Sequence, residues 1–86
     1  MDKIAEEISE LSTVVTSLNE IQEDASVPRN VRMQIQNIIS TIKDNTELSI
    51  KVNKSLNQLD EISNDVNLHS YTRTQIWNIM SVLEKI

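Results

Sequence analysis

Apolar residues recur along this chain at helical spacing in four successive stretches, separated by short polar breaks. In the first stretch they follow one another at steps of 4, 3, 4 and 3 residues, at Ile4, Ile8, Leu11, Val15 and Leu18. Such steps place the side chains on one face of a helix, and Val14 and Ile21 widen that face. The pattern therefore predicts a long helix over about residues 2–24.

The other three stretches predict helices over about residues 28–43, 46–65 and 70–85. Their apolar stripes are Val31, Ile35, Ile38 and Ile42, then Leu48, Val52, Leu56, Leu59 and Ile62, and finally Ile76, Ile79, Met80 and Leu83. All the residues of these stripes are Ile, Leu, Val or Met, and the chain has no Gly, no Phe and one Pro. This composition disfavours a sheet, which uses Gly at tight turns and aromatic residues on its faces.

Polar and helix-breaking residues mark the ends of the predicted helices. Pro28 suits the first turn of a helix, because the N–H that it lacks has no partner there. Because the chain has no Gly, we expect Asn45 and Asn67 to take any left-handed turn conformation. The expected N-caps are Ser26 or Val27 for the second helix and Asp44, Asn45 or Thr46 for the third.

The chain also repeats itself. With an offset of 41, residues 18–42 match residues 59–83 without a gap, and 10 of 25 aligned pairs are identical. We interpret the chain as two tandem helical hairpins, with repeat units at about residues 11–43 and 52–84. One hairpin leaves an apolar side open, so two must close on each other. The predicted fold is all-α, a four-helix antiparallel bundle with pseudo-two-fold symmetry that forms a single domain over residues 1–86.

Certain strings of this sequence are also distinctive. They are Leu18-Asn19-Glu20-Ile21, Asp24, Val27-Pro28-Arg29-Asn30-Val31-Arg32, Leu59-Asp60-Glu61-Ile62-Ser63-Asn64-Asp65 and Ile76-Trp77-Asn78-Ile79. Through them the chain resembles uncharacterised protein family 0147 over roughly residues 11–84. The resemblance implies a small archaeal, cytoplasmic four-helix protein, and it implies no activity. The chain departs from the family at Val66 and His69, where prolines are common.

Composition excludes several functions. The chain has no Cys, which excludes disulfides and thiolate chemistry, and no apolar run is long enough to span a bilayer. Glu6, Glu7 and Glu10 interrupt the first apolar residues, so we expect no signal peptide and a cytoplasmic location. The net charge of −5 disfavours non-specific binding to nucleic acid.

Charged residues recur in both repeat units. Arg32 and Arg73 follow the turns, and carboxylates precede them at Glu20, Asp24, Glu61 and Asp65. A tight hairpin brings each Arg near its carboxylates, and a guanidinium grips a carboxylate in bidentate fashion. We interpret these residues as structural ion pairs that fix the two turns. The alternative is that the two clusters form a ligand site.

Two amide pairs also recur, Gln34 with Gln75 and Asn37 with Asn78. They form a polar layer between helices or face solvent. Of these two readings, we favour partial burial for Asn37 and Asn78, where a polar layer sets helix register.

Two chemical functions lack support in the sequence. Four-helix carboxylate metal sites combine inward Glu residues with Glu-x-x-His pairs, whereas His69, the single histidine, falls in a turn, and Glu20 and Glu61 lack nitrogen partners. Ser70 beside His69 is no catalytic dyad by adjacency alone. A carboxylate metal-binding bundle stays an alternative, but we expect no enzyme and no cofactor.

Two alternatives concern macromolecular partners. Arg29 and Arg32 lie near a helix start, with Arg73 at the matching place in the second unit, as in helix–turn–helix readers of nucleic acid. We interpret the aromatic residue Trp77 as a bundle-edge residue that closes the core, and the alternative is that Trp77 and Tyr71 anchor an interface. Ile50 and Val82 lie off the main stripes and add, with Trp77 or Ile86, to a hypothetical exposed apolar patch. We favour a non-enzymatic protein–protein interaction module whose partner is another protein or a second copy of the chain.

Overall fold

The structure is a computed structural model that describes the backbone of residues 3–86 and the side chains of residues 9–86. The predicted positions Asp2, Ile4, Glu6, Glu7 and Ile8 lie outside the described residues or side chains. The described chain forms α1 (Lys3–Glu23), α2 (Arg29–Lys43), α3 (Leu48–Ser63) and α4 (Ser70–Glu84). These bounds lie within two residues of the predicted ones.

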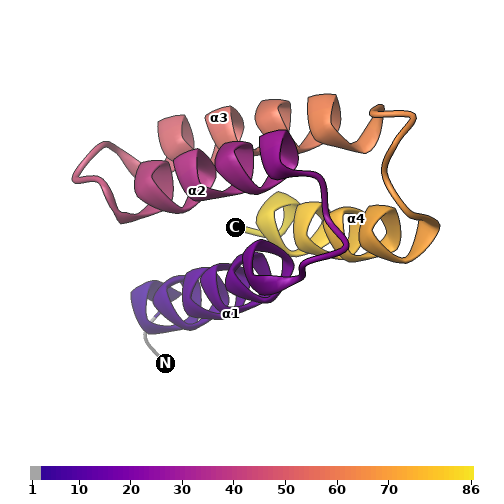
Figure 1. Cartoon of the computed structure of the whole chain (residues 1–86). Helices are drawn as coiled ribbons and strands as arrows, with labels where there is room; N and C mark the ends of the chain where they lie inside the picture. Colours follow the sequence, from indigo (N-terminus) through magenta and orange to yellow (C-terminus); the bar gives the residue numbers. More distant parts are fainter. Residues whose placement is uncertain (1–2) are drawn as a thin grey trace.

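The four helices pack in two layers. Figure 1 shows α2 and α3 lying over α1 and α4, with consecutive helices running in opposite directions. Each helix packs against two others, α1 and α3 both against α2 and α4, and the diagonal partners make no close backbone contact. The turn after α1 and the turn after α3 therefore lie at one end of a body of 41 × 21 × 20 Å.

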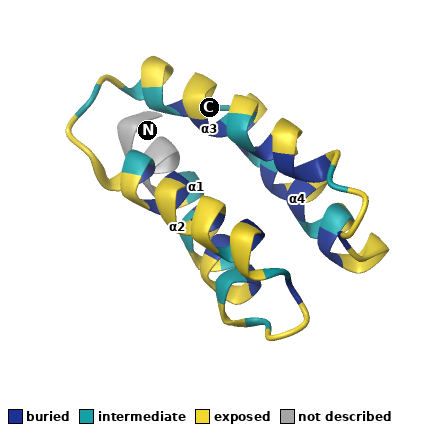
Figure 2. Ribbon diagram, turned by 45° about the horizontal axis from the view of Figure 1, so that its top comes forward, coloured by how far each residue is buried: buried dark blue, intermediate teal, exposed yellow. Residues whose placement is uncertain are grey.

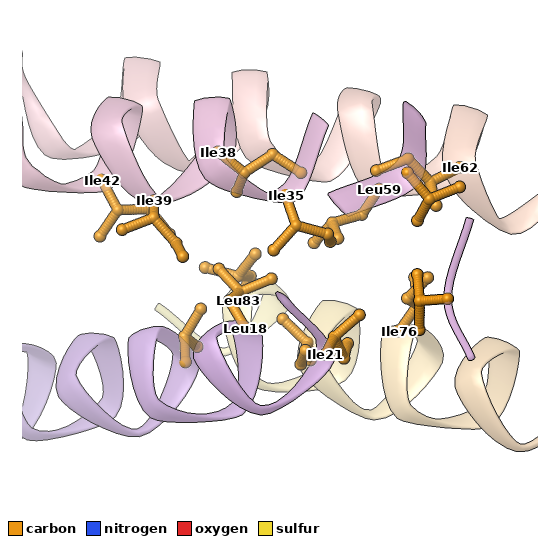
Figure 3. Packing of buried hydrophobic residues seen from close by; sticks show 14 of the residues in the cluster. Leu18, Ile21, Ile35, Ile38, Ile39, Ile42, Leu59, Ile62, Ile76 and Leu83 are labelled. Carbon is orange, nitrogen blue, oxygen red and sulfur yellow. The ribbon is translucent and has the colours of Figure 1, made fainter. Parts of the chain in front are cut away.

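The core lies between the two layers, as the dark blue inner faces in Figure 2 show. Ile35, Ile38, Ile39 and Ile42 of α2 point toward Leu18 and Ile21 of α1 and toward Ile76 and Leu83 of α4, while Leu59 and Ile62 of α3 lie beside them (Figure 3). All ten side chains are buried. Fully burying one such side chain contributes ~1.5–3 kcal/mol, so this cluster holds the layers together.

The α1 stripe differs from the predicted heptad pattern. Val14, Leu18 and Ile21 are buried, whereas Leu11 and Val15 are only partly buried. Val14 and Ile21 do widen the apolar face, as predicted, but the predicted stripe residues Leu11 and Val15 are less buried than either.

The two turns at the common end are built alike. Asp24 O accepts the N–H of Val27 at 3.1 Å, and Asp65 O accepts the N–H of Leu68 at 3.2 Å. Val27 and Leu68, which are 41 residues apart, are both buried and belong to the core. Each turn thus closes one end of the bundle with an apolar side chain.

The predictions for helix ends need correction. The N-caps are Pro28, Glu47 and His69, and none of them makes a side-chain capping hydrogen bond. Asp44 is instead the C-cap of α2, and its carboxylate accepts the N–H of Asn45 and the hydroxyl of Thr46. Within residues 3–86 no residue has a positive φ, so the left-handed conformation expected at Asn45 and Asn67 is not used. Both turns have enough residues to reverse the chain with ordinary backbone angles.

Candidate functional site

Arg73 joins the second turn to the helix before it. Its Nε donates to the carbonyl of Ser63 at 2.9 Å, and its Nη2 donates to the carbonyl of Asp65 at 2.9 Å. Ser63 is the last residue of α3, and the last carbonyls of a helix have no partner within the helix, so the guanidinium satisfies one group that α3 leaves open. The predicted position of Arg73 at the turn is right, but its described partners are main-chain carbonyls and not the carboxylates of Glu61 and Asp65.

Arg32, at the matching position of the first unit, is placed differently. Its Nε is buried and has no hydrogen-bond partner. With Arg29, Met33 and two glutamines it lines a shallow hollow of about 290 Å³ between α1 and α2. The glutamines are joined, because Gln22 Nε2 donates to Gln36 Oε1. The two arginines predicted as a nucleic-acid contact therefore do lie together, whereas Arg73 is engaged on the other hairpin.

The carboxylates after α1 and α3 serve the turns themselves. Asp24 Oδ1 accepts the N–H of Ser26 at 2.9 Å and its hydroxyl at 2.7 Å. Asp65 Oδ1 accepts the N–H of Asn67 at 2.9 Å. The hydroxyl and then the amide of Ser26, with a smaller contribution from the nearby His69, lower the pKa of Asp24 against a small opposing effect of burial. The influence of His69 on Asp24 agrees with the two turns lying at one end of the bundle.

Glu20 and Glu61 are not brought together. Both are exposed, and they belong to α1 and α3, which lie diagonally across the bundle. In the part of the chain whose side chains are described, no three His, Asp or Glu residues gather in a way that could hold a metal ion. No helix among the described residues is long and apolar enough to cross a membrane.

A groove, here called the α1/α4 groove, runs between α1 and α4 with a volume of about 270 Å³. Its polar lining comes from Thr13, Ser17 and Glu20 of α1 and from Tyr71, Gln75 and Asn78 of α4. Val14 and Ile79 lie beneath these polar groups, and Val82 is at the edge. Gln75 Oε1 is buried here without a hydrogen-bond partner. The groove thus combines an apolar floor with acceptor groups.

A second groove, the α3/α4 groove, is more apolar and has a volume of about 350 Å³. Its lining is Leu48, Ser49, Val52, Asn53 and Leu56 of α3, and Leu83, Glu84 and Ile86 at the end of the chain. Leu48, Leu56 and Ile86 are only partly buried, so their side chains remain open to solvent in part.

The structure separates the off-stripe apolar residues. Trp77 is 53% exposed, so it does not close the core as a buried residue does. Tyr71 is also largely exposed, and it lines the α1/α4 groove together with Val82, whereas Ile86 lines the α3/α4 groove. The hypothetical patch of Ile50 and Val82 with Trp77 or Ile86 is therefore wrong, because Val82 lines the α1/α4 groove, whereas Ile50 lies on α3 and Ile86 lines the α3/α4 groove.

The predicted polar layer is also not present. Asn37 and Asn78 are both exposed, so partial burial was the wrong alternative. Sequence reasoning also missed the buried polar residues Ser55, Ser63 and Thr72, of which Ser55 is 0% exposed and has an Oγ without a partner. A signal existed, because Ser55 stands at the repeat position of Val14, where the first unit has an apolar core residue.

The fold and these shallow surfaces define a class, the small all-α proteins of four packed helices. The Uncharacterised protein family (UPF0147) matches residues 1–86, and the chain belongs to that family, which confirms the resemblance.

Two solved structures are similar to the chain. A crystal structure of a protein of unknown function, MMP1188, is 40% identical with a TM-score of 0.86, and the match covers 90% of this chain and 89% of that chain. A crystal structure of a UPF0147 protein from Thermoplasma acidophilum is 32% identical with a TM-score of 0.86, covering 90% and 92% of the two chains. No curated protein matches the sequence.

Proposed function

We propose that the protein is a non-enzymatic helical module that binds a protein partner through the outer face of α3 and α4. We define this α3/α4 face as Leu48, Leu56 and Ile86, which line the α3/α4 groove, together with Trp77 and Met80 of α4, which lie outside its lining. The observation that carries the proposal is the exposure of Trp77, whose indole is 53% accessible on the surface of a regular helix.

Trp77 has no evident role in folding. At the matching repeat position the first unit carries Gln36, a polar residue that accepts a hydrogen bond from Gln22. An aromatic residue is thus not required at this position for a hairpin of this kind to form. Tryptophan is enriched at the centres of protein interfaces, where burying one indole supplies a large share of the binding energy.

The neighbours of Trp77 extend this apolar surface. Residues three and four apart share a helix face, so Trp77, Met80 and Glu84 lie along one side of α4. Met80 is partly buried and packs against the core, and Glu84 lines the α3/α4 groove. The exposed indole therefore leads along α4 into a concave apolar surface, the shape that receives the apolar face of a partner helix.

Light scattering on a size-exclusion column, followed by affinity capture from native extract, tests the proposal. The wild-type chain is compared with Trp77→Gln and with the control Ile50→Gln, because Ile50 is 45% exposed, as Trp77 is at 53%, but does not belong to the α3/α4 face defined above. We expect a dimer or a recovered partner protein that Trp77→Gln loses and Ile50→Gln keeps. A monomer that recovers no protein, or equal losses in both variants, would contradict the proposal.

One observation favours a nucleic-acid function as the alternative. Arg29 and Arg32 line one hollow, and no acidic side chain lies in the first turn of α2. Against it stand the net charge of −5 and the engagement of Arg73 on main-chain carbonyls. A salt-dependent mobility shift with RNA or DNA that Arg29→Gln abolishes would favour this alternative over the protein-binding function.

The proposal includes two finer statements about the molecule. We infer that the two hairpins are related by a pseudo-two-fold axis, which the repeat and the equal construction of the turns at Asp24 and Asp65 support. We also infer that the protein acts in an archaeal cytoplasm, which rests on the family resemblance.

A further inference from the structure

We propose that the α1/α4 groove is a binding site for a primary alkylammonium group, carried by a small amine or by a lysine side chain. This site is separate from the α3/α4 face, because its lining residues belong to the opposite side of α4 and to α1. The proposal is thus independent of the proposed protein-binding function.

The lining of the α1/α4 groove contains an acceptor that receives no hydrogen bond. Gln75 Oε1 lies buried in the groove lining and receives no hydrogen bond. A buried acceptor without a donor costs about 1–3 kcal/mol. An ammonium group has three N–H donors and no acceptor, so it supplies the missing donor when the Gln75 side chain turns its amide oxygen into the groove.

The lining of the α1/α4 groove is also negatively charged. Glu20 is the one charged side chain in the groove lining among the described residues, so the groove attracts cations. The hydroxyl of Thr13, which lies on the same helix, already donates to the carbonyl of Ser9 at 3.1 Å. It therefore does not need the ligand as an acceptor, and the carboxylate of Glu20 favours a cationic donor.

The floor and rim of the α1/α4 groove favour a ligand that has an alkyl chain. Val14 and Ile79 form an apolar floor under the polar rim, where the methylenes of an alkyl chain find apolar contact while the ammonium stays at the carboxylate. Tyr71 is 72% exposed and stands at the rim, and the face of a phenol ring attracts a cation. An alkylammonium fits these two features better than an inorganic cation does.

The repeat supplies an internal comparison. Glu61 stands at the repeat position of Glu20, and Lys54 at the repeat position of Thr13. At this repeat position the second unit therefore has the ammonium group of Lys54, whereas the first unit has only the hydroxyl of Thr13. Within the part of the chain that the structure describes, the lining of the α1/α4 groove has the acidic residue Glu20 but no lysine. An ammonium group beside Glu20 would therefore come from a ligand.

The test is a titration of the ¹⁵N-labelled full chain followed by NMR, with n-butylammonium as the probe and n-butanol as the uncharged probe of the same length. We expect saturable shifts at the Gln75 side-chain amide and at Tyr71 with n-butylammonium, with a dissociation constant of about 1–10 mM for so small a ligand. We expect no saturation with n-butanol.

Variants separate the site from general surface binding. Glu20→Gln should weaken binding about threefold, as expected for an exposed ion pair, and Glu20→Gln with Tyr71→Leu about tenfold. The control is Glu61→Gln, an equally exposed carboxylate on α3, which should bind as the wild type does. The absence of saturable shifts, saturation by n-butanol, or an equal loss in Glu61→Gln would overturn the proposal.

The source of the ammonium is decided by two more probes. Tighter binding of 1,4-diaminobutane than of Nα-acetyl-lysine methylamide would assign the site to a small diamine. The reverse order would assign it to a lysine side chain of a polypeptide. Either order keeps the alkylammonium site, provided that Glu20→Gln weakens both probes.

Discussion

Arg73 Nε donates a 2.9 Å hydrogen bond to the main-chain carbonyl of Ser63, which ties the first turn of α4 to the last turn of α3. Its Nη2 holds the Asp65 carbonyl in the same way. One guanidinium thus fastens a turn that has no glycine and no side-chain N-cap. Arg32, which stands at the equivalent position of the first unit, has a buried Nε that makes no hydrogen bond.

This difference predicts that the two arginines contribute unequally to stability. Arg73→Met should lower the free energy of unfolding by about 1.5–3 kcal/mol, because two hydrogen bonds from a charged donor are lost and the Ser63 carbonyl is left without a partner. Arg32→Met should lower it by less than about 1 kcal/mol, since no hydrogen bond of its Nε is lost. Urea denaturation measures both values, and an equal or larger loss for Arg32→Met would contradict the assignment.

The buried Ser55 predicts a stabilising substitution. Ser55→Ala removes a hydroxyl that is buried without a partner and should raise the free energy of unfolding by about 1 kcal/mol. The matched control is Ser63→Ala on the same helix, because Ser63 is also buried but its hydroxyl donates to the Asp60 carbonyl at 2.7 Å. Both variants gain helix propensity, so the difference between them isolates the hydroxyl. Ser63→Ala should be no more stable than the wild type by urea denaturation.

Asp24 predicts a pH dependence of stability. Its pKa is lowered in the folded chain, so its carboxylate contributes stability at pH values above its ordinary pKa, and this contribution is lost as the pH falls through the folded value. Asp24→Asn should therefore be less stable than the wild type at pH 7, and the difference should shrink toward acid pH. The urea midpoint measured from pH 7 to strongly acid pH gives this curve.

Ser26 provides the control for that titration. Ser26→Ala removes the hydroxyl donor but keeps the amide donor to Asp24, so its pH curve should lie between those of the wild type and Asp24→Asn. A gap between wild type and Asp24→Asn that stays constant with pH would show that the loss in Asp24→Asn does not come from the charge of the carboxylate.

The fold could be predicted from sequence because its signals are redundant. Leu18 and Leu59, or Ile35 and Ile76, are identical across the repeat and buried in both units, so periodicity and repetition agreed. Details that depend on one local geometry could not be predicted. The turn residues Val27 and Leu68 are buried although they lie outside any helical stripe, and only the closed end of the bundle explains this.

The candidate site was predictable only in part. Trp77 and Tyr71 were recognised as candidates from their residue types, yet the sequence could not say that Tyr71 lines the α1/α4 groove and that Trp77 is exposed elsewhere on α4. Arg32 and Arg73 stand at equivalent positions of the repeat but differ in their hydrogen bonds, because these depend on side-chain placement within a few tenths of an ångström. The grooves themselves form between helices distant in sequence, where no periodicity within one helix is informative.

The exposure of Trp77 predicts that its substitution removes partner binding but leaves the stability of the fold nearly unchanged. Trp77→Gln should change the free energy of unfolding by less than about 0.5 kcal/mol, because the indole is half exposed and Gln36 stands at the matching position. The loss of binding expected of this variant is then a surface effect. A loss of stability above about 2 kcal/mol would mean that Trp77 is a structural residue.

Photo-crosslinking in native extract tests the protein-binding function most directly. A benzophenone amino acid replaces Trp77 in one full-length chain and Ile50 in another, and both chains are irradiated and analysed for covalent adducts by mass spectrometry. The account predicts a discrete protein adduct, or a crosslinked dimer, from position 77 and none from position 50. Equal labelling at both positions, or no adduct at position 77, would contradict it.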